Sequence, residues 1–397
     1  MNGFSPTTSI FGEQIGSFLT GGGAAANKYA KADLFRQLEG LIRPFLRCSA
    51  RNDGLPLRTL DGLSFRKFHI LKHPGTFLCR LLLVFFLTAI VLACGGEKEI
   101  VISGRTMGTT YQVKVYAGRG ISAEALKEKI ELRLEALNQV FSTYRPDSEI
   151  SRFNRFYRTG ERFAVSTDFS RVMETAARIY RLTDGRWDGT VDPLVRLWGF
   201  HDKGDRLRLP SEHEIQVQKK QIGFDSIKIL PEGFLIKTKP DVTLDLASIA
   251  KGYAVDEIAI LLRGEGLGRH LVEIGGEVLA AGSKPDGSRW KVGINRPEKG
   301  AALDSVYRVV ALTDRAMATS GDYRNFFVRE GIVYTHVIDP RTGYPVQTGV
   351  VSASVTADTC AFADGLATAL MVLAPEQGIE LVDRLAGVEC VLVVREA

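Results

Sequence analysis

Apolar residues recur at helical spacing in several stretches of the chain. One helix is predicted over 122–141, where Ser122 is placed to cap the first turn. The residues on its apolar face are Leu126, Ile130, Leu134, Leu137 and Phe141. Further helices are predicted over 167–183, over about 249–262, from near Ala361, and over 375–386.

Other stretches have the pattern of strands. Residues 99–116 are predicted to form two strands around Thr106-Met107-Gly108-Thr109, and CVLVV at 390–394 is a short strand. Residues 268–312 alternate and are rich in Val, Ile and Gly, as in antiparallel strands. Strands and helices are mixed without regular β-α alternation, and no repeat or linker follows residue 110. The sequence therefore predicts one α+β domain, with antiparallel or mixed sheets flanked by helices.

The N-terminal part of the chain differs from this domain. Residues 78–93 include an uncharged apolar run that is short for a membrane span but typical of a secretory signal. The run ends at Ala93-Cys94-Gly95, which resembles a bacterial lipoprotein cleavage site with Cys94 as the lipid-bearing residue. A buried hydrophobic helix is the alternative. We interpret residues 1–77 as the result of a misplaced start or as a disordered extension, rather than as an extra domain, and 94–397 as the globular part.

Composition narrows the functional class. The net charge of +5 is modest, and no Lys/Arg run or aromatic-basic stripe is present, so a nucleic-acid partner is not expected. The 5 cysteines show no CxxC or paired spacing, which argues against a zinc site or a disulfide framework. GxGxxG and Walker patterns are absent, so a standard dinucleotide or P-loop fold is not expected either.

Two clusters have the residue types of a site for phosphate and a metal ion. In DLASIAKG (245–252), a predicted helix start with Lys251 suits a phosphate, and Asp245 suits a ribose or a base edge. Asp364 and Thr368 are i and i+4 on a predicted helix, an oxygen pair suited to Mg²⁺ with a backbone carbonyl near Ser248. The alternatives are an Asp near a helix start with a surface lysine, and a capping Asp with a back-bonded Thr.

A histidine and several ring-bearing residues complete the candidate chemistry. His336 lies where a VYTHVI strand enters a DPRTG turn, and it is a candidate general base or a structural histidine. Met107, Tyr144 and Trp187-Asp188 are candidates to hold a flat heterocycle, with ordinary core packing as the alternative. The remaining candidates are the EIGGE turn (273–277), whose glycines permit close backbone approach, and three phosphate contacts, Thr319, Ser320 and Arg324.

Taken together, these motifs resemble the ApbE family of flavin transferases over roughly residues 100–394. The resemblance rests on TMGT, STYRPDSEISRFN, TDGRWD with TVDPLVRLWGF, DLASIAKGYA, EIGGE, ATSGDYRNFF, HVIDPRTGYP and ADGLATAL. It implies an α+β ApbE-like domain, Mg²⁺ at Asp364 and Thr368 with a contribution from Ser248, and His336 near the chemistry. The FAD contacts that we assign on this basis are Met107, Tyr144, Arg186, Trp187, Asp188, Asp245, Lys251, Glu273, Thr319, Ser320, Arg324 and Ile338.

The resemblance also implies an activity and a place for it. The family attaches FMN from FAD through a phosphodiester to a Thr or Ser hydroxyl of a target protein, a subunit of a membrane redox pump of the Nqr or Rnf type. With the lipoprotein-like segment, we expect a lipid-anchored protein of the bacterial inner membrane that faces the periplasm. The alternatives are a Mg²⁺-dependent pyrophosphatase that splits FAD into FMN and AMP, and a flavin-binding lipoprotein without catalysis.

Overall fold

The structure is a computed structural model that describes residues 97–201, 208–298, 305–322 and 325–395. The predicted extension, the apolar segment and Cys94 lie outside the described residues, and so does Arg324. Within the described ranges, no helix is both long enough and apolar enough to cross a membrane.

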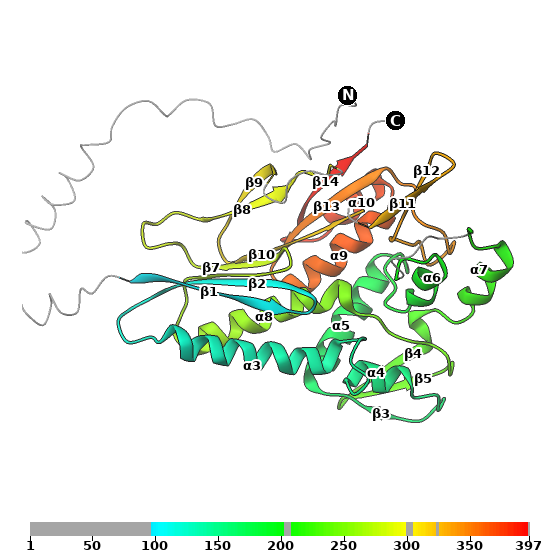
Figure 1. Cartoon of the computed structure of the whole chain (residues 1–397), viewed down its shortest axis with the longest axis horizontal. Coiled ribbons are helices and arrows are strands. Elements are labelled where there is room, and N and C mark those ends of the chain that lie inside the picture. The colour runs from blue at the N-terminus through cyan, green and yellow to red at the C-terminus, as the bar shows by residue number, and fades with distance from the viewer. Residues whose placement is uncertain (1–96, 202–207, 299–304, 323–324, 396–397) are drawn as a thin grey trace, which may run out of the picture. The chain divides into compact units, whose positions relative to one another are not determined.

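A sheet of seven strands, antiparallel throughout, organises the described domain (Figure 1). The strands lie in the order β1-β2-β6-β7-β10-β13-β14. Their bounds are β1 Lys98–Thr106, β2 Thr109–Ala117, β6 His270–Ile274, β7 Glu277–Ala281, β10 Arg315–Gly321, β13 Val350–Ala357 and β14 Glu389–Val394. β1 and β2 turn at Met107 and Gly108, as predicted, and Met107 has a left-handed φ of 47° there.

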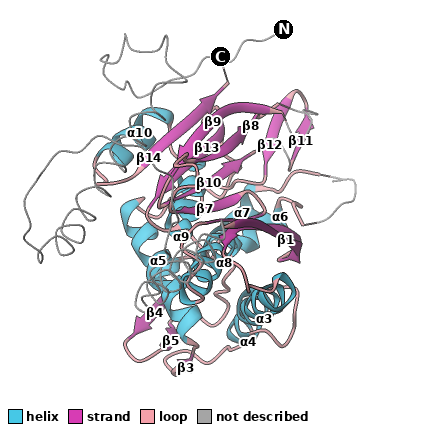
Figure 2. Ribbon diagram, turned by 90° about the vertical axis from the view of Figure 1, so that its left-hand side faces the viewer, coloured by secondary structure: helices cyan, strands magenta, loops and turns pink. Residues whose placement is uncertain are grey.

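Two helices pack directly on one another and on this sheet. α8 (Ala247–Gly264) contacts β6 and β7, and α9 (Cys360–Val372) contacts β10 and β13 (Figure 2). All residues of α9 except Thr368 are buried, because sheet and helices enclose it. A Cβ at Gly252 of α8 would meet the Cys360 carbonyl oxygen at 2.4 Å, so the two backbones touch where this glycine lies.

A second layer of helices covers α8 and α9. α3 (Ala123–Phe141) and α5 (Thr167–Leu182) both contact α8, and α5 also contacts α9. Ser122 caps α3 by accepting a hydrogen bond from the Ala125 N–H at 3.2 Å, as predicted. The five predicted apolar positions of α3 are buried, at Leu126, Ile130, Leu134, Leu137 and Phe141. α10 (Pro375–Asp383) packs against β14.

Shorter elements surround this framework. Three small antiparallel sheets are formed by β3 (Phe163–Ala164) with β5 (Phe234–Lys237) and β4 (Ile227–Leu230), by β8 (Trp290–Asn295) with β9 (Val306–Leu312), and by β11 (Phe326–Arg329) with β12 (Ile332–Thr335). The short helices are α4 (Glu149–Asn154), α6 (Asp192–Leu197), α7 (Glu212–Lys219) and the 3₁₀ turn η2 (Phe224–Ser226). The antiparallel sheets with segregated helices confirm the predicted α+β class.

Candidate active site

A cavity of about 940 Å³ opens among the first turns of α8, the inner face of α9, β10 and the turn between β6 and β7. Its volume is at the upper end of the range usual for small-molecule sites. Most of the residues predicted for the site line it: Arg186, Trp187, Asp188, Asp245, Ser248, Lys251, Glu273, Thr319, Ser320, His336, Ile338, Asp364 and Thr368. Residues far apart in sequence are thus brought to one place by the sheet and the α8–α9 pair.

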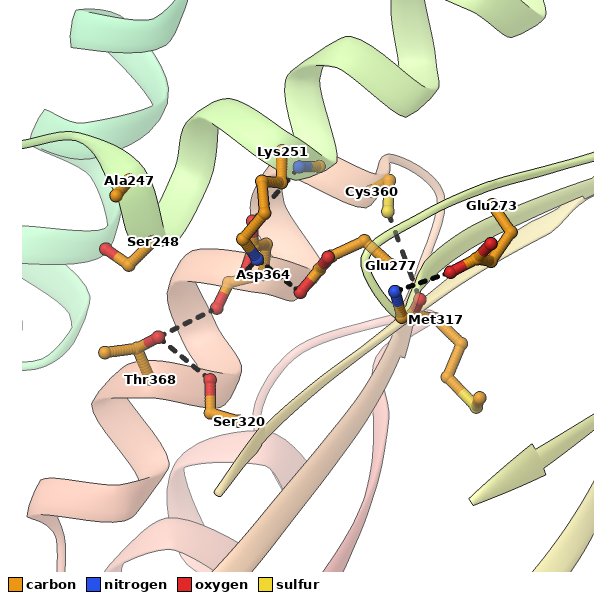
Figure 3. Close-up of polar contacts among 12 residues, drawn as sticks. Ala247, Ser248, Lys251, Glu273, Glu277, Met317, Ser320, Cys360, Asp364 and Thr368 are labelled. Carbon is orange, nitrogen blue, oxygen red and sulfur yellow. Dashed lines mark hydrogen bonds and ion pairs between the residues drawn. The ribbon is translucent and has the colours of Figure 1, made fainter. Parts of the chain in front are cut away.

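One end of the cavity is charged (Figure 3). The Lys251 ammonium lies 2.6 Å from Oε1 of Glu277 and 3.9 Å from Oδ1 of Asp364. Burial alone would lower the pKa of Lys251, but the two carboxylates outweigh it and raise that pKa above its ordinary value. Lys251 is therefore a fixed positive charge, and the alternative of a surface lysine does not describe it.

Asp364 is buried at the contact between α8 and α9. Its Oδ2 accepts a hydrogen bond from the Gly252 N–H at 3.0 Å. Burial acts to raise the pKa of the Asp364 carboxyl, while the Lys251 charge acts to lower it. An amide at this position of a helix ordinarily serves the carbonyl four residues earlier, here that of Ser248. The Asp364 side chain thus reaches the backbone of α8 next to the residue predicted to supply a carbonyl ligand.

Hydroxyl groups lie beside this carboxylate. Thr368 Oγ1 is 2.9 Å from Ser320 Oγ and 3.3 Å from the Asp364 carbonyl oxygen, so the back-bonded threonine of the alternative reading is present. Thr368 nevertheless lines the cavity, and so does Ser320. Figure 3 shows the two side chains pointing toward one another. Thr319, the other predicted hydroxyl contact of β10, pairs with Ser354 at 2.7 Å.

These oxygen atoms fit a small hard cation. The part of the chain that the structure describes contains no cluster of three or more His, Cys, Asp or Glu side chains able to hold a metal. Mg²⁺ does not need one, because it commonly takes one or two carboxylates from the protein and completes its shell with water and phosphate oxygen. Asp364, the Thr368 hydroxyl and a backbone carbonyl would be a donor set of that kind.

The start of α8 forms the floor beside this oxygen set. The Trp187 indole N–H donates to Ser248 Oγ at 2.9 Å, which fixes the hydroxyl in the first turn. Asp245 Oδ1 accepts from the Ala247 N–H at 2.8 Å, and burial raises the pKa of Asp245. The Asp188 carboxylate is satisfied internally, since it accepts from the Thr190 N–H and hydroxyl at 2.7 and 2.6 Å and from the Phe224 N–H at 3.1 Å.

The turn between β6 and β7 forms another wall. Gly275 and Gly276 have φ values of 64° and 106°, which L side chains rarely adopt, so the predicted close backbone turn is confirmed. Glu273 Oε1 closes the turn by accepting from the Gly276 N–H at 2.7 Å. Glu277, the next residue, directs its carboxylate to Lys251 as described above.

His336 also lines the cavity. The Asn325 carbonyl oxygen accepts from the His336 backbone N–H and lies 3.1 Å from ring Nδ1. Because a carbonyl oxygen only accepts, Nδ1 must carry the proton, which leaves the lone pair on Nε2. Burial lowers the pKa of His336, and the Asn325 contact acts in the opposite direction. The imidazole is therefore neutral at pH 7 and can take a proton.

Other predicted residues are placed differently. Met107 packs against the main core and Tyr144 is 89% exposed, and neither lines the cavity in this structure. Arg186 lies 3.8 Å from Asp184, and Ile338 is buried opposite Pro345 at the cavity wall. The proposed roles of these four residues in FAD binding stay predictions.

Several lining residues were not singled out from the sequence. Glu277 belongs to the quoted EIGGE motif but was given no role, although an acidic residue after two glycines is a plausible partner for a nearby lysine. Asp192 lines the cavity and bridges Arg196 at 2.6 Å and His201 at 2.7 Å. Asn325, which sets the tautomer of His336, has no sequence signal because it acts through its main chain.

The fold and the cavity together define an α+β protein with a large cavity that carries charged and hydroxyl side chains. The chain belongs to the ApbE family, whose model matches residues 107–392. It is 41% identical over 302 residues to the FAD:protein FMN transferase of Vibrio cholerae serotype O1, covering 75% of this chain and 89% of that protein.

Solved structures agree with this assignment. The flavin transferase ApbE of Vibrio cholerae matches with a TM-score of 0.68 and 38% identity, over 76% of this chain and 94% of that one. The apo flavinyl transferase ApbE of Pseudomonas stutzeri matches with a TM-score of 0.68 and 37% identity, over 76% and 93%. The predicted family is confirmed, and so is the prediction of an enzyme, since these relatives are named transferases.

Proposed function

We propose that the chain is an FAD:protein FMN transferase that moves FMN from FAD to a Thr or Ser hydroxyl of an acceptor protein and releases AMP. The observation that carries this proposal is one cavity holding both a neutral histidine and a buried carboxylate-hydroxyl pair, His336 with Asp364 and Thr368. The names of the relatives support FAD as the donor and a protein as the acceptor.

The charged end is suited to the pyrophosphate of FAD. The first turn of α8 presents the positive end of the helix dipole, and Lys251 adds a positive charge beside it. Asp364, Thr368 and the Ser248 region would hold Mg²⁺. When bound, this ion supplies charge neutralisation at the phosphate oxygens. Protein groups need only orient the substrate, because phosphoryl transfer depends mainly on position and charge.

His336 is suited to activate the acceptor. Its Nε2 lone pair takes the proton from the acceptor hydroxyl as that oxygen forms a bond to the flavin-side phosphorus. The bond between this phosphorus and the bridging oxygen breaks, and the electron pair leaves with AMP. The proton ends on His336 and the FMN ends in a phosphodiester. Two bonds form, from oxygen to phosphorus and from Nε2 to the proton, and two break, the acceptor O–H bond and the P–O bond to AMP.

The proposal also covers the identity of the acceptor protein and the location of the enzyme in the cell. We infer that the acceptor is a subunit of a membrane redox complex of the Nqr or Rnf type. We also infer that Cys94 is lipidated and anchors the protein at the inner membrane, facing the periplasm. The apolar run before Cys94 and the family resemblance support these inferences.

The test is a mass measurement on the acceptor. The full chain is incubated with FAD, Mg²⁺ and a candidate acceptor domain, which is then weighed under denaturing conditions. We expect a gain of one FMN that EDTA abolishes, and no gain in an acceptor whose target hydroxyl is replaced by Ala. Free FMN and AMP with an unmodified acceptor would instead identify a pyrophosphatase. Intact FAD across a panel of such acceptors would favour a flavin-binding protein.

A further inference from the structure

A stack of aromatic rings lies outside the main core, next to His336. Trp198 and Tyr334 stack with ring centroids 5.6 Å apart, and Tyr334 and Phe327 stack at 5.0 Å with an angle of 13°. Phe327 then contacts Phe200 at 5.5 Å. We call these four rings, Trp198, Tyr334, Phe327 and Phe200, the ring stack. They belong to a second hydrophobic cluster that also contains Leu194, Ile215 and Ile338.

The ring stack is held by a hydrogen bond to the main chain and by the pairing of two strands. The Trp198 indole N–H donates to the Gly343 carbonyl at 2.8 Å, which ties the end of α6 to the turn after His336. Gly343 has a φ of 85°, and a Cβ there would meet Ile215 of α7 at 2.5 Å. Phe327 and Tyr334 are direct cross-strand partners in β11 and β12, so their side chains share one face.

The last ring of the stack contacts the candidate base. Phe200 is buried, with 8% of its surface exposed. The centroids of the Phe200 and His336 rings are 6.4 Å apart and the ring planes are inclined at 67°, which is an edge contact. Among the described residues, the His336 ring is also contacted at Nδ1, by the carbonyl oxygen of Asn325 just before β11. A hydrogen bond at one ring nitrogen fixes the tautomer but leaves the ring free to tilt about it. The Phe200 edge restricts that tilt.

We propose that Phe200 is a positioning residue, which holds the His336 imidazole in the orientation that directs Nε2 at the acceptor hydroxyl. This inference rests on the proposed function, because it gives the orientation of the ring a purpose. The ring stack then serves as a rigid support that links the base to α6, α7 and the turn at Gly343. Holding a reacting group within a fraction of an ångström of its productive position accounts for large factors in rate.

The activity test compares Phe200→Leu with two matched variants of the full chain. Phe200→Leu keeps an apolar side chain but loses the flat ring, and we expect kcat to fall about tenfold with KM for FAD changed by less than about twofold. Phe200→Tyr keeps the ring and should recover most of kcat. Leu194→Ala lowers stability through the same cluster without touching His336, and it should retain kcat. Equal losses in Phe200→Leu and Leu194→Ala at matched Tm would overturn the proposal.

A second readout does not depend on activity. Imidazole nitrogen signals of the 6 histidines are recorded in the full chain with labelled histidine, and His336→Gln assigns the relevant pair. We expect one Nδ1-protonated form in the wild type and in Leu194→Ala, and a second or averaged form in Phe200→Leu. Unchanged His336 signals in Phe200→Leu overturn the inference. If the wild type transfers no FMN while these signals still respond to Phe200, the proposed function fails and the positioning contact stands.

Discussion

Two parts of the cavity lining, around Lys251 and around His336, are held in place by different interactions. At the charged end, the buried carboxylates of Glu277 and Asp364 and the partly buried Lys251 ammonium hold one another through charge. At what we call the histidine end, His336 is neutral and contacts the Asn325 carbonyl oxygen and the Phe200 ring. A buried charge cannot lose its partner cheaply, whereas a neutral ring can be removed at little cost to folding. The charged end should therefore couple stability to function, and the histidine end should separate them.

The largest expected effect is that of Asp364→Ala on transfer. We expect a loss of about a thousandfold or more, because the cation loses its one carboxylate in the proposed site. The fold should survive with a lowered Tm, because Lys251 keeps Glu277 as its partner while the buried Gly252 N–H loses its acceptor. Acceptor mass over time gives the rate, and circular dichroism with thermal melting gives the fold. Transfer at the wild-type rate would remove the metal assignment.

Lys251→Met should lower stability most. The substitution leaves Glu277 and Asp364 in a buried site without their shared cation, and we expect the free energy of unfolding to fall by about 3 kcal/mol. Urea unfolding monitored by fluorescence measures it. The double variant Lys251→Met with Glu277→Leu should recover part of the loss. If the single variant is as stable as the wild type, the ion pair does not hold this end together.

His336→Ala sharpens the contrast. Transfer should fall on the order of a hundredfold, within the range for loss of a general base, while Tm changes little. The measurement is a single-turnover rate beside a melting curve of the same sample. A large drop in Tm with an unchanged rate would reverse the roles of the two ends.

The smallest expected effect is that of pH on kcat/KM near neutrality. A general base works unprotonated, and burial lowers the pKa of His336, so its neutral form persists to a lower pH than for an ordinary histidine. We expect kcat/KM to be level around pH 7 and to decline only below about 6.5, the unperturbed value. The profile is measured with and without Phe200→Leu. An acid limb centred above that value would argue against His336 as the base.

Local patterns were enough for much of the fold. The helices predicted near 122–141, 167–183, 249–262 and 375–386 are present as α3, α5, α8 and α10, because apolar residues recur at helical spacing in each. β13 was not predicted, since it is covered on both sides and VVSASVTA lacks alternation. The short helices α6 and α7 were also missed, and both belong to the second hydrophobic cluster.

The site was predictable where it follows the geometry of one element. Asp364 and Thr368 share a face of α9 because they are four residues apart. The pairing of Lys251 with Glu277 depends on how α8 crosses the β6–β7 turn, which no local pattern specifies. The ring stack depends on the register of β11 with β12 and on the position of α6. Contacts of this kind come from tertiary structure alone.

The contact at Gly252 has a consequence for engineering. Replacing a glycine inside a helix by alanine is a common way to raise thermal stability, since the helix gains about 1 kcal/mol. At Gly365 the new Cβ would meet the tip of Ile179 at 2.4 Å and Cγ1 of Ile249 at 2.9 Å, so the obstacle is side chains that would have to shift. At Gly252 the obstacle is the main chain of Cys360, which has no alternative rotamer. A stabilisation programme that treats both glycines alike would push α8 and α9 apart, and with them the side chains of Lys251 and Asp364.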